Sequence, residues 1–337
     1  MNLHFGMKKH KHIFLFLLCC VPLIATAQYT DVINSNRPGQ SVSAYSIGKN
    51  VLQAEVGLFY DHQEHDLLGT KSELYGSDFA LRYGLLFEQL ELIYEGAFLK
   101  EAITLNGTAI TQNNSNLSAN RMGLKFLVYD PFKNEERNKP NLKSWRANNK
   151  FQLKNLVPAI SIYAGANYTF DDNPFLPNIP TFTQRGMIAT QSKLTPRSVL
   201  ITNFIYDYIG SDDPMMSYII TYTRALKNPK WSIFIEHEGI QSDRYSDGLF
   251  RGGTAYLFSR DFQIDAFIGT GYKTTPTRLF GNIGVSYRLD MHQDSYKTIE
   301  SDADKSIKKG AMKTKKKGFL GLFKKKKKKQ KTSEIEF

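Results

Sequence analysis

Residues 51–60 read VLQAEVGLFY, and the alternation in this stretch decides the fold class. Apolar Leu52, Val56 and Leu58 occupy one parity, while the acidic Glu55 lies on the other. A period of two places successive side chains on opposite faces of a β-strand. The stretch is therefore predicted to be a strand with one apolar face and one polar face.

The same alternation recurs along most of the chain, with turn-forming residues between the runs. Most runs are about ten residues or longer, which suits a tilted crossing of a hydrocarbon layer better than a strand of a soluble sheet. The number of runs is even, as expected for a bacterial single-chain barrel. The predicted strands are 50–61, 72–84, 88–99, 118–129, 156–169, 184–194, 197–209, 215–225, 230–239, 248–258, 261–272 and 278–289.

The N-terminal 27 residues match a secretory signal peptide. A basic stretch with Lys8, Lys9 and Lys11 precedes a short apolar run, and Ala25-Thr26-Ala27 forms a cleavage site. Both cysteines, Cys19 and Cys20, lie inside that run, so the mature chain is predicted to lack cysteine. A lipoprotein reading is disfavoured because no small residue precedes Cys19.

Outside that run, no stretch of 18 consecutive apolar residues occurs, which excludes transmembrane helices. The remaining structure that can span a lipid bilayer is a closed barrel. The 18 Tyr and 23 Phe, many near predicted strand ends, fit aromatic girdles at the membrane interface. We therefore expect an all-β, transmembrane, antiparallel up-and-down β-barrel at 50–290, after a periplasmic lead-in at 28–49.

The formal charge of +12 belongs to the ends of the chain. Residues 28–300 carry 27 basic and 28 acidic side chains, which argues against a nucleic-acid groove. Residues 291–337 are Lys-rich and are predicted to be a disordered periplasmic tail. A sharper alternative is that this tail docks on anionic lipid or cell-wall polymer, with the apolar patch at 318–323 as a wedge.

The connections are expected to be short at the periplasmic end and long at the outer end. Residues 101–117 and 171–183 are the predicted long outer loops. One exception is 130–155, a long polar connection that contains Trp145 and falls on the periplasmic side. It is expected either to fold back as a plug or to hide a missed strand.

If the apolar parity faces lipid, the charged parity faces the lumen. Opposite charges on neighbouring strands can pair there, either to hold the shape of a narrow lumen or to form a selectivity constriction. Arg37 is a candidate for a plug or gating contact with lumen carboxylates, although a segment of this kind is more often a simple lead-in to the first strand. The lumen candidates are Arg82, Glu91, Glu95, Arg121, Lys125, Asp265 and Arg288, with Glu55, Asp78, Glu236 and Glu238 beside them.

The last predicted strand carries a second motif. Its residues 281–290, GNIGVSYRLD, resemble the polar-x-Gly-x-x-aromatic-x-hydrophobic signal of barrels that are handed to the outer-membrane assembly machinery. The matching residues are Asn282, Gly284, Tyr287 and Leu289. The expected partners are therefore outer-membrane lipid and that machinery.

The start of the mature chain resembles a known family. Asn36-Arg37-Pro38 with Ser43, followed by a Gly-x-x-Gln-x-Glu-x-Gly pattern ending at Gly57 with altered spacing, is similar to the opening of Bacteroidetes outer-membrane transporter barrels. These are grouped as the "Putative MetA-pathway of phenol degradation" family. The GVSYRLD ending and the Lys-rich tail also match, so the resemblance spans most of 30–330. It implies a barrel for uptake of hydrophobic or aromatic small molecules.

The expected function is thus an outer-membrane channel or transporter with a charge-lined lumen. The alternatives are a non-conducting structural or adhesive barrel and a barrel enzyme such as a lipase. An enzyme is not expected, because the only neighbouring Ser and His of the required kind are Ser242 and His237, in an acidic strand end. The stretch HQEHD at 62–66 lacks four well-placed ligands, so no metal or cofactor is expected.

Overall fold

The computed structural model describes residues 32–108, 111–170, 172–243 and 245–292. The predicted signal peptide and the Lys-rich tail lie outside these residues. Among the described residues, no helix is long and apolar enough to cross a membrane.

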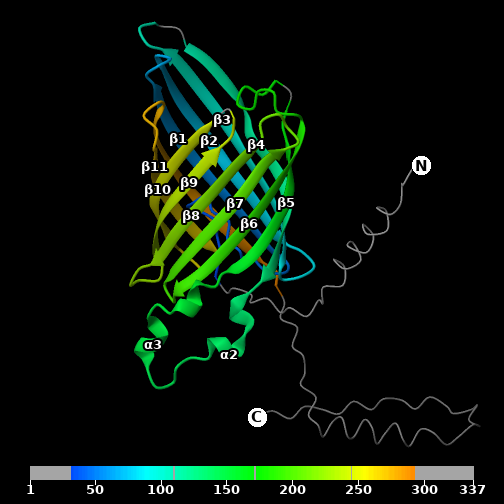
Figure 1. The fold of residues 1–337 in the computed structure, drawn as a ribbon, viewed down its shortest axis with the longest axis vertical. Coiled ribbons are helices and arrows are strands. Elements are labelled where there is room, and N and C mark those ends of the chain that lie inside the picture. The colour runs from blue at the N-terminus through cyan, green and yellow to red at the C-terminus, as the bar shows by residue number, and fades with distance from the viewer. Residues whose placement is uncertain (1–31, 109–110, 171, 244, 293–337) are drawn as a thin grey trace, which may run out of the picture. The chain divides into compact units, whose positions relative to one another are not determined.

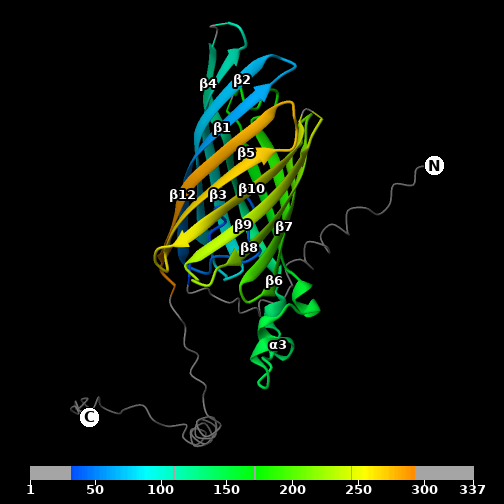
Figure 2. The same cartoon turned by 90° about the vertical axis from the view of Figure 1, so that its left-hand side faces the viewer.

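Twelve strands form in the described part of the chain, and each pairs antiparallel with its neighbour in sequence. β1 also pairs with β12, from Val51 opposite Asp290 to Glu64 opposite Thr277, which closes the barrel (Figures 1 and 2). The predicted all-β, up-and-down barrel is confirmed. Its strands are β1 (Val51–His65), β2 (Thr70–Gly84), β3 (Leu90–Leu105), β4 (Thr111–Tyr129), β5 (Ala159–Tyr168), β6 (Phe182–Thr195), β7 (Ser198–Ile209), β8 (Met215–Ala225), β9 (Trp231–Gln241), β10 (Ser246–Leu257), β11 (Phe262–Gly271) and β12 (Thr277–Asp290).

The outer face of the barrel is apolar. Leu58 is 60% exposed, Ile235 66% and Ile283 63%, whereas polar side chains of the opposite parity, such as Gln53 and Glu91, are fully buried. A soluble β-barrel has the reverse arrangement, with its apolar parity inside. The exposed apolar belt therefore makes this a transmembrane barrel, in which the polar parity is turned away from lipid.

We call the end at which β1 begins and β12 ends the proximal end, and the opposite end the distal end. A chain of aromatic contacts follows the proximal edge of the apolar belt from β9 to β12. Aromatic rings of this kind settle at the boundary between hydrocarbon and water. We call this chain of rings the proximal girdle; its members are Trp231, Tyr256, Phe258, Phe262 and Tyr287.

The predicted contrast in connection length holds only in part: the proximal turns 85–89, 196–197, 226–230 and 258–261 are short, as predicted, but most distal connections are short as well. β3 runs to Leu105 and β4 starts at Thr111, so most of the predicted loop 101–117 is strand. Residues 112–117, QNNSNL, show no alternation of apolar and polar side chains. Strands that extend beyond the hydrocarbon layer can pair through backbone hydrogen bonds alone and need no apolar face. The distal connections 66–69 and 210–214 are also short. The connection between β5 and β6 remains long.

The connection between β4 and β5 is neither a plug nor a missed strand. β4 and β5 are direct neighbours in the barrel, with Arg121 opposite Asn167. The residues between them form short helical turns, and Figure 1 shows α2 and α3 outside the barrel at its proximal end. The turns are η1 (Pro131–Lys133), α2 (Glu135–Asn138), α3 (Trp145–Asn149) and η2 (Leu153–Leu156).

Candidate functional site

Residues 33–47, which we call the inner segment, run inside the barrel before β1 begins. Ala44 and Ile47 are fully or almost fully buried. Asn36 Oδ1 accepts a hydrogen bond from the Ser43 backbone N–H at 3.1 Å, and Asn34 Nδ2 donates to Ser43 Oγ at 3.1 Å. These contacts fold the segment back on itself, so that residues 37–40 form its tip.

Arg37 holds the tip to the barrel wall. Its guanidinium lies 3.1 Å from both Asp78 carboxylate oxygens on β2 and 3.2 Å from Asp265 Oδ1 on β11. It also donates to Asn282 Oδ1 on β12 at 2.5 Å. Charge-assisted, multidentate bonds of this kind are among the strongest that a side chain makes. Arg37 therefore ties β2 to β11 and β12, which lie more than 170 residues later in the sequence.

Two glycines make room for the Arg37 guanidinium. A Cβ atom at Gly57 of β1 or at Gly284 of β12 would overlap its nitrogen atoms. The two glycines lie opposite each other in the β1–β12 ladder. Arg37 can therefore occupy this position only because neither of these wall residues has a side chain.

The rest of the tip is bound through its backbone. Glu236 of β9 accepts from the N–H groups of Gln40 and Ser41 at 3.0 to 3.3 Å. The Asn203 side chain of β7 bonds both the N–H and the C=O of Val42, at 2.6 and 2.9 Å. Such pairing satisfies backbone groups that the barrel wall would otherwise leave buried and unpaired.

The Val42 side chain packs into a ring of apolar residues that face the interior. These neighbours come from β3 and from β5 to β8. They interrupt the otherwise polar interior and close the space around the inner segment. The ring consists of Ile93, Tyr163, Met187, Ile205 and Ile219.

A network of buried ion pairs lies on the wall formed by β1 to β4, which we call the charged wall. Arg82 lies 2.5 Å from Glu91 and 3.2 Å from Glu55, and Lys125 lies 3.0 Å from Glu91. All four side chains are almost inaccessible to solvent. Buried charges need this kind of mutual pairing to be tolerated.

The charged wall also binds the inner segment. Lys125 Nζ donates to the Ser43 and Tyr45 carbonyls at 2.9 and 3.1 Å, and Arg82 donates to the Asn34 carbonyl at 2.7 Å. Each cation therefore serves the wall and the segment together. Removal of one would take a bond from both a wall carboxylate and a backbone carbonyl of the inner segment.

Tyr45 fastens the segment at the proximal end. Its hydroxyl donates to Asp130 at 3.2 Å, and its ring faces Lys193 Nζ at 5.2 Å. Burial raises the pKa of the Tyr45 phenol, and the charge and hydrogen bond of Asp130 raise it further. The phenol is therefore a neutral donor across the ordinary pH range.

The remaining lumen candidates lie outside this network. Arg121 pairs with Glu95 at 2.5 Å, and both border the same small cavity as Arg37. Arg288 pairs with Asp261 at 2.8 Å at the proximal rim. The structure thus gathers Asp265 around Arg37, and Arg82, Glu91 and Lys125 into the charged wall, but leaves Arg121 and Arg288 in separate ion pairs.

The residues of the predicted assembly signal divide between the two faces of β12. Tyr287 and Leu289 are about half exposed on the outer face, where a lipid-facing signal would be read. Asn282 and Gly284 face inward and contact or accommodate Arg37. A role of all four in assembly stays a prediction, and two of them have a structural role besides.

Sequence reasoning missed two wall residues that bind the inner segment. Asn203 bonds Val42, and Gln191 accepts from both Ser43 and Ala44. Both are uncharged and lie on the inward parity of their strands. A search for amides on the inward parity would have found them, whereas a search for charge could not.

Two small cavities lie on either side of the tip. The first, about 120 Å³, is lined by charged residues such as Glu55, Asp78 and Glu95. The second, about 180 Å³, borders a stretch of wall from β7 to β10 without an ionisable side chain, which we call the neutral wall. Asn36, Arg37 and Gly39 line both cavities, so the tip lies between them. The neutral wall consists of Val199, Ile201, Thr223, Ser232 and Ala255.

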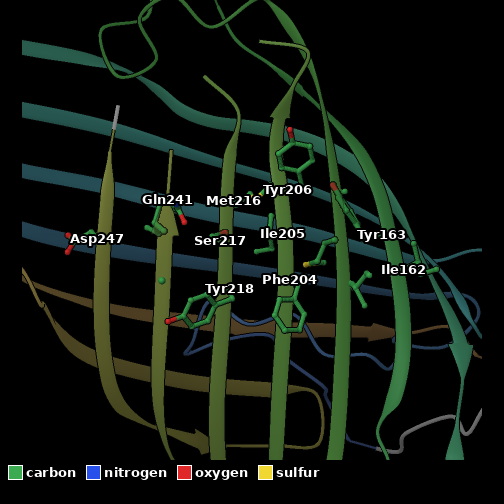
Figure 3. A pocket seen from close by; sticks show the side chains of 15 residues that line it. Ile162, Tyr163, Phe204, Ile205, Tyr206, Met216, Ser217, Tyr218, Gln241 and Asp247 are labelled. Atoms are coloured by element: carbon green, nitrogen blue, oxygen red, sulfur yellow. The ribbon is translucent and has the colours of Figure 1, made fainter. Parts of the chain in front are cut away.

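A larger hollow of about 720 Å³ lies over β5 to β10. Figure 3 shows the rings of Phe204 and Tyr206 on β7 and that of Tyr218 on the neighbouring β8. Phe204 is 57% exposed on the outer face, and a Cβ at Gly186 would meet nothing. This hollow is therefore a groove of the lipid-facing surface and does not belong to the lumen.

The Ser and His that were weighed for an enzyme have other partners. His237 Nε2 lies 3.1 Å from the Tyr218 hydroxyl. The His237 ring stacks on the Phe250 ring, with 4.5 Å between the two ring centroids. The Ser242 hydroxyl bonds the backbone of Tyr245. The contacts described for His237 are those of an aromatic cluster on the outer face.

These features define a class of protein: a transmembrane β-barrel whose lumen holds its own N-terminal segment. The chain belongs to the family described as "Putative MetA-pathway of phenol degradation", which matches residues 35–289. The predicted family is confirmed. An origin in the Bacteroidetes stays a prediction. A comparison with curated proteins finds no match.

Several solved structures are similar to the chain at low sequence identity. An outer membrane channel from Pseudomonas putida F1 is 11% identical, with a TM-score of 0.48, and covers 76% of this chain and 100% of its own. The transport unit of the autotransporter AIDA-I from Escherichia coli is 11% identical, with a TM-score of 0.43 and coverages of 76% and 93%. The CymD monoaromatic hydrocarbon channel is 9% identical, with a TM-score of 0.37 and coverages of 73% and 90%.

Proposed function

We propose that the protein is an outer-membrane channel for small neutral molecules, and that the inner segment closes it at rest. The observation that carries the proposal is the position of the tip between the two cavities of the lumen. Movement of residues 37–40 away from the wall would join these cavities. In this proposal the proximal end faces the periplasm, because the inner segment enters the barrel at that end and β12 also ends there.

The route that we propose follows the neutral wall. On the opposite side, Arg82, Glu91 and Lys125 are fully buried in mutual ion pairs, and the two cations bind the segment, so this wall acts as its fixed support. The cavity beside the neutral wall, about 180 Å³, has room for a molecule of about the size of one substituted aromatic ring. The family description, with its mention of phenol degradation, agrees with a small aromatic solute.

The replacement Arg37→Ala tests the closing role of the tip. Asp78 and Asp265 would lose their common cation, and the tip would lose bonds that are each worth about 1.5–3 kcal/mol. Since 1.4 kcal/mol corresponds to a factor of ten, we expect the open fraction in planar-bilayer recordings to rise roughly tenfold or more. The wild type should be mostly silent.

Arg197→Ala is the matched control. Arg197 is an exposed arginine in the short turn between β6 and β7, and its loss should leave the current unchanged. If Arg37→Ala were as silent as the wild type, the tip would not be the gate. If removal of residues 37–40 also gave no current, the protein would be a non-conducting structural barrel.

The charge of the solute can be tested separately with Arg37→Ala in lipid vesicles. Nicotinamide and nicotinate are nearly equal in size, but the second carries a negative charge. We expect faster protein-dependent uptake of nicotinamide, with protein-free vesicles as the baseline. Equal rates for the two solutes would mean that the neutral wall does not select them.

A further inference from the structure

We propose that residues 131–157, which we call the proximal segment, bind the surface of anionic phospholipid at the proximal edge of the barrel. The segment contains η1, α2, α3 and η2 and lies between the ends of β4 and β5. The proposal does not depend on whether the barrel conducts. It rests on the ordered structure of the segment, its exposed apolar side chains, its charge and its position.

The proximal segment is an ordered structure held by its own polar groups. Asn134 and Ser144 cap α2 and α3 by accepting from the N–H groups of Arg137 and Ala147. Asn138 Nδ2 donates to three backbone carbonyls within the segment. Backbone groups that are satisfied in this way keep a chain in one conformation without a hydrophobic core.

Both ends of the segment are fastened to the barrel. Near its start, the Phe132 ring faces Lys193 Nζ at 4.6 Å. Near its end, Asn155 donates to the Leu194 carbonyl at 3.1 Å, and Ser192 donates to the Leu156 carbonyl at 3.0 Å. The segment therefore keeps a fixed place beside the proximal end of β6.

Several large apolar side chains of the segment are exposed to solvent, which is energetically unfavourable in water. Leu142 is 94% exposed, Trp145 79% and Leu153 77%. Phe151 and Leu156 are about half exposed. Large apolar side chains left exposed in one short segment indicate a surface that another apolar phase covers.

The charge of the segment is strongly positive, which identifies the phase that covers it. Seven basic residues stand against two acidic ones, Glu135 and Glu136. A basic and aromatic surface is the pattern of an interfacial membrane anchor, in which rings and aliphatic groups enter the lipid while Lys and Arg remain among the phosphates. The basic residues are Lys133, Arg137, Lys139, Lys143, Arg146, Lys150 and Lys154.

The segment also adjoins the proximal edge of the apolar belt. Val128 and Tyr129, directly before it, are outward and exposed, as are Leu156 and Val157 at its end. The belt at this end is bordered by the proximal girdle, which places lipid headgroups at this height. The exposed side chains of the segment thus continue a surface that already contacts lipid.

The chain contains two tryptophans, Trp145 in the segment and Trp231 in the proximal girdle, which permits a direct test. The full-length variant Trp231→Phe, refolded into vesicles, reports on Trp145 alone. We expect its emission to shift to shorter wavelength in vesicles that contain phosphatidylglycerol. We also expect lipids with brominated acyl chains to quench it, and high salt to weaken both effects.

Trp145→Phe is the matched control, because Trp231 then reports on the girdle. Its emission should be at short wavelength in every vesicle and independent of lipid charge. The proposal is overturned if Trp145 emits as in water and is equally open to acrylamide in neutral and anionic vesicles. It is equally overturned if the shift grows with protein concentration without quenching by brominated lipid, since a second copy of the chain would then cover the segment.

Discussion

The two sides of the lumen differ in what holds them. The charged wall is filled by Arg82, Glu91 and Lys125, which are fully buried in mutual ion pairs, and its two cations bind the inner segment. The neutral wall borders a cavity of about 180 Å³ and contributes Thr, Ser and aliphatic side chains such as Thr223 and Ala255 to its lining. The comparison teaches that charge in a narrow barrel can serve as a support, while the larger of the two cavities beside the tip borders the wall where charge is absent.

The largest effect is expected from Glu91→Gln on the charged wall. The change leaves Arg82 and Lys125 without their shared carboxylate in a site closed to solvent. Loss of one partner of a buried pair costs about 3–5 kcal/mol. The barrel should lose its heat-resistant gel mobility at a clearly lower temperature than the wild type.

Thr223→Val on the neutral wall is the matched control, and we expect a change of about 1 kcal/mol or less. If both variants unfolded at the same temperature, the two walls would not differ in the way described.

A smaller effect on stability is expected from Gly284→Ala, at the point of the wall that faces the Arg37 guanidinium. The added methyl group overlaps the Arg37 guanidinium, and overpacking of this kind costs about 1–3 kcal/mol. Because the strain falls on the contact of the tip, bilayer recordings should show a higher open fraction with the barrel still folded. Gly252→Ala faces lipid, with its nearest neighbour, the Phe234 carbonyl oxygen, at 3.8 Å, and should change nothing. If Gly284→Ala gave the same currents as the wild type, Gly284 would have no part in closing the channel.

The smallest effect on stability is expected from Ala255→Leu. The larger side chain enters a cavity of about 180 Å³, so the cost should stay near 1 kcal/mol or below. In an Arg37→Ala background it should nevertheless slow nicotinamide uptake several-fold, since it narrows the proposed route. Unchanged uptake would show that solutes pass elsewhere.

Much of the fold could be predicted because the strands cross lipid. Leu52, Val56 and Leu58 lie outward and Gln53 and Glu55 inward, as the alternation indicates. The distal end of the β3–β4 hairpin could not be found, because strands outside the membrane pair through backbone groups and carry no apolar parity. The signal peptide and the tail stay predictions, since both lie outside the described residues.

The candidate site was predictable only in part. Charge on the inward parity pointed to Arg82, Glu91 and Lys125, and the Asn36-Arg37-Pro38 motif pointed to the segment, with lead-in and plug left open. The ring around Val42 and the bonds to Asn203 are invisible in the sequence, because those residues resemble ordinary members of their strands.

By itself, the amino-acid sequence determined that alternate residues face lipid, and with it the closed barrel and the family. Only the tertiary structure decided that Arg37, Gly57, Asp78, Asp265 and Gly284 meet at one point. The physical reason is the separation along the sequence of the residues involved. Alternation is a local property of each strand, whereas the site is assembled from strands joined only when β1 pairs with β12 and the inner segment enters the space they enclose.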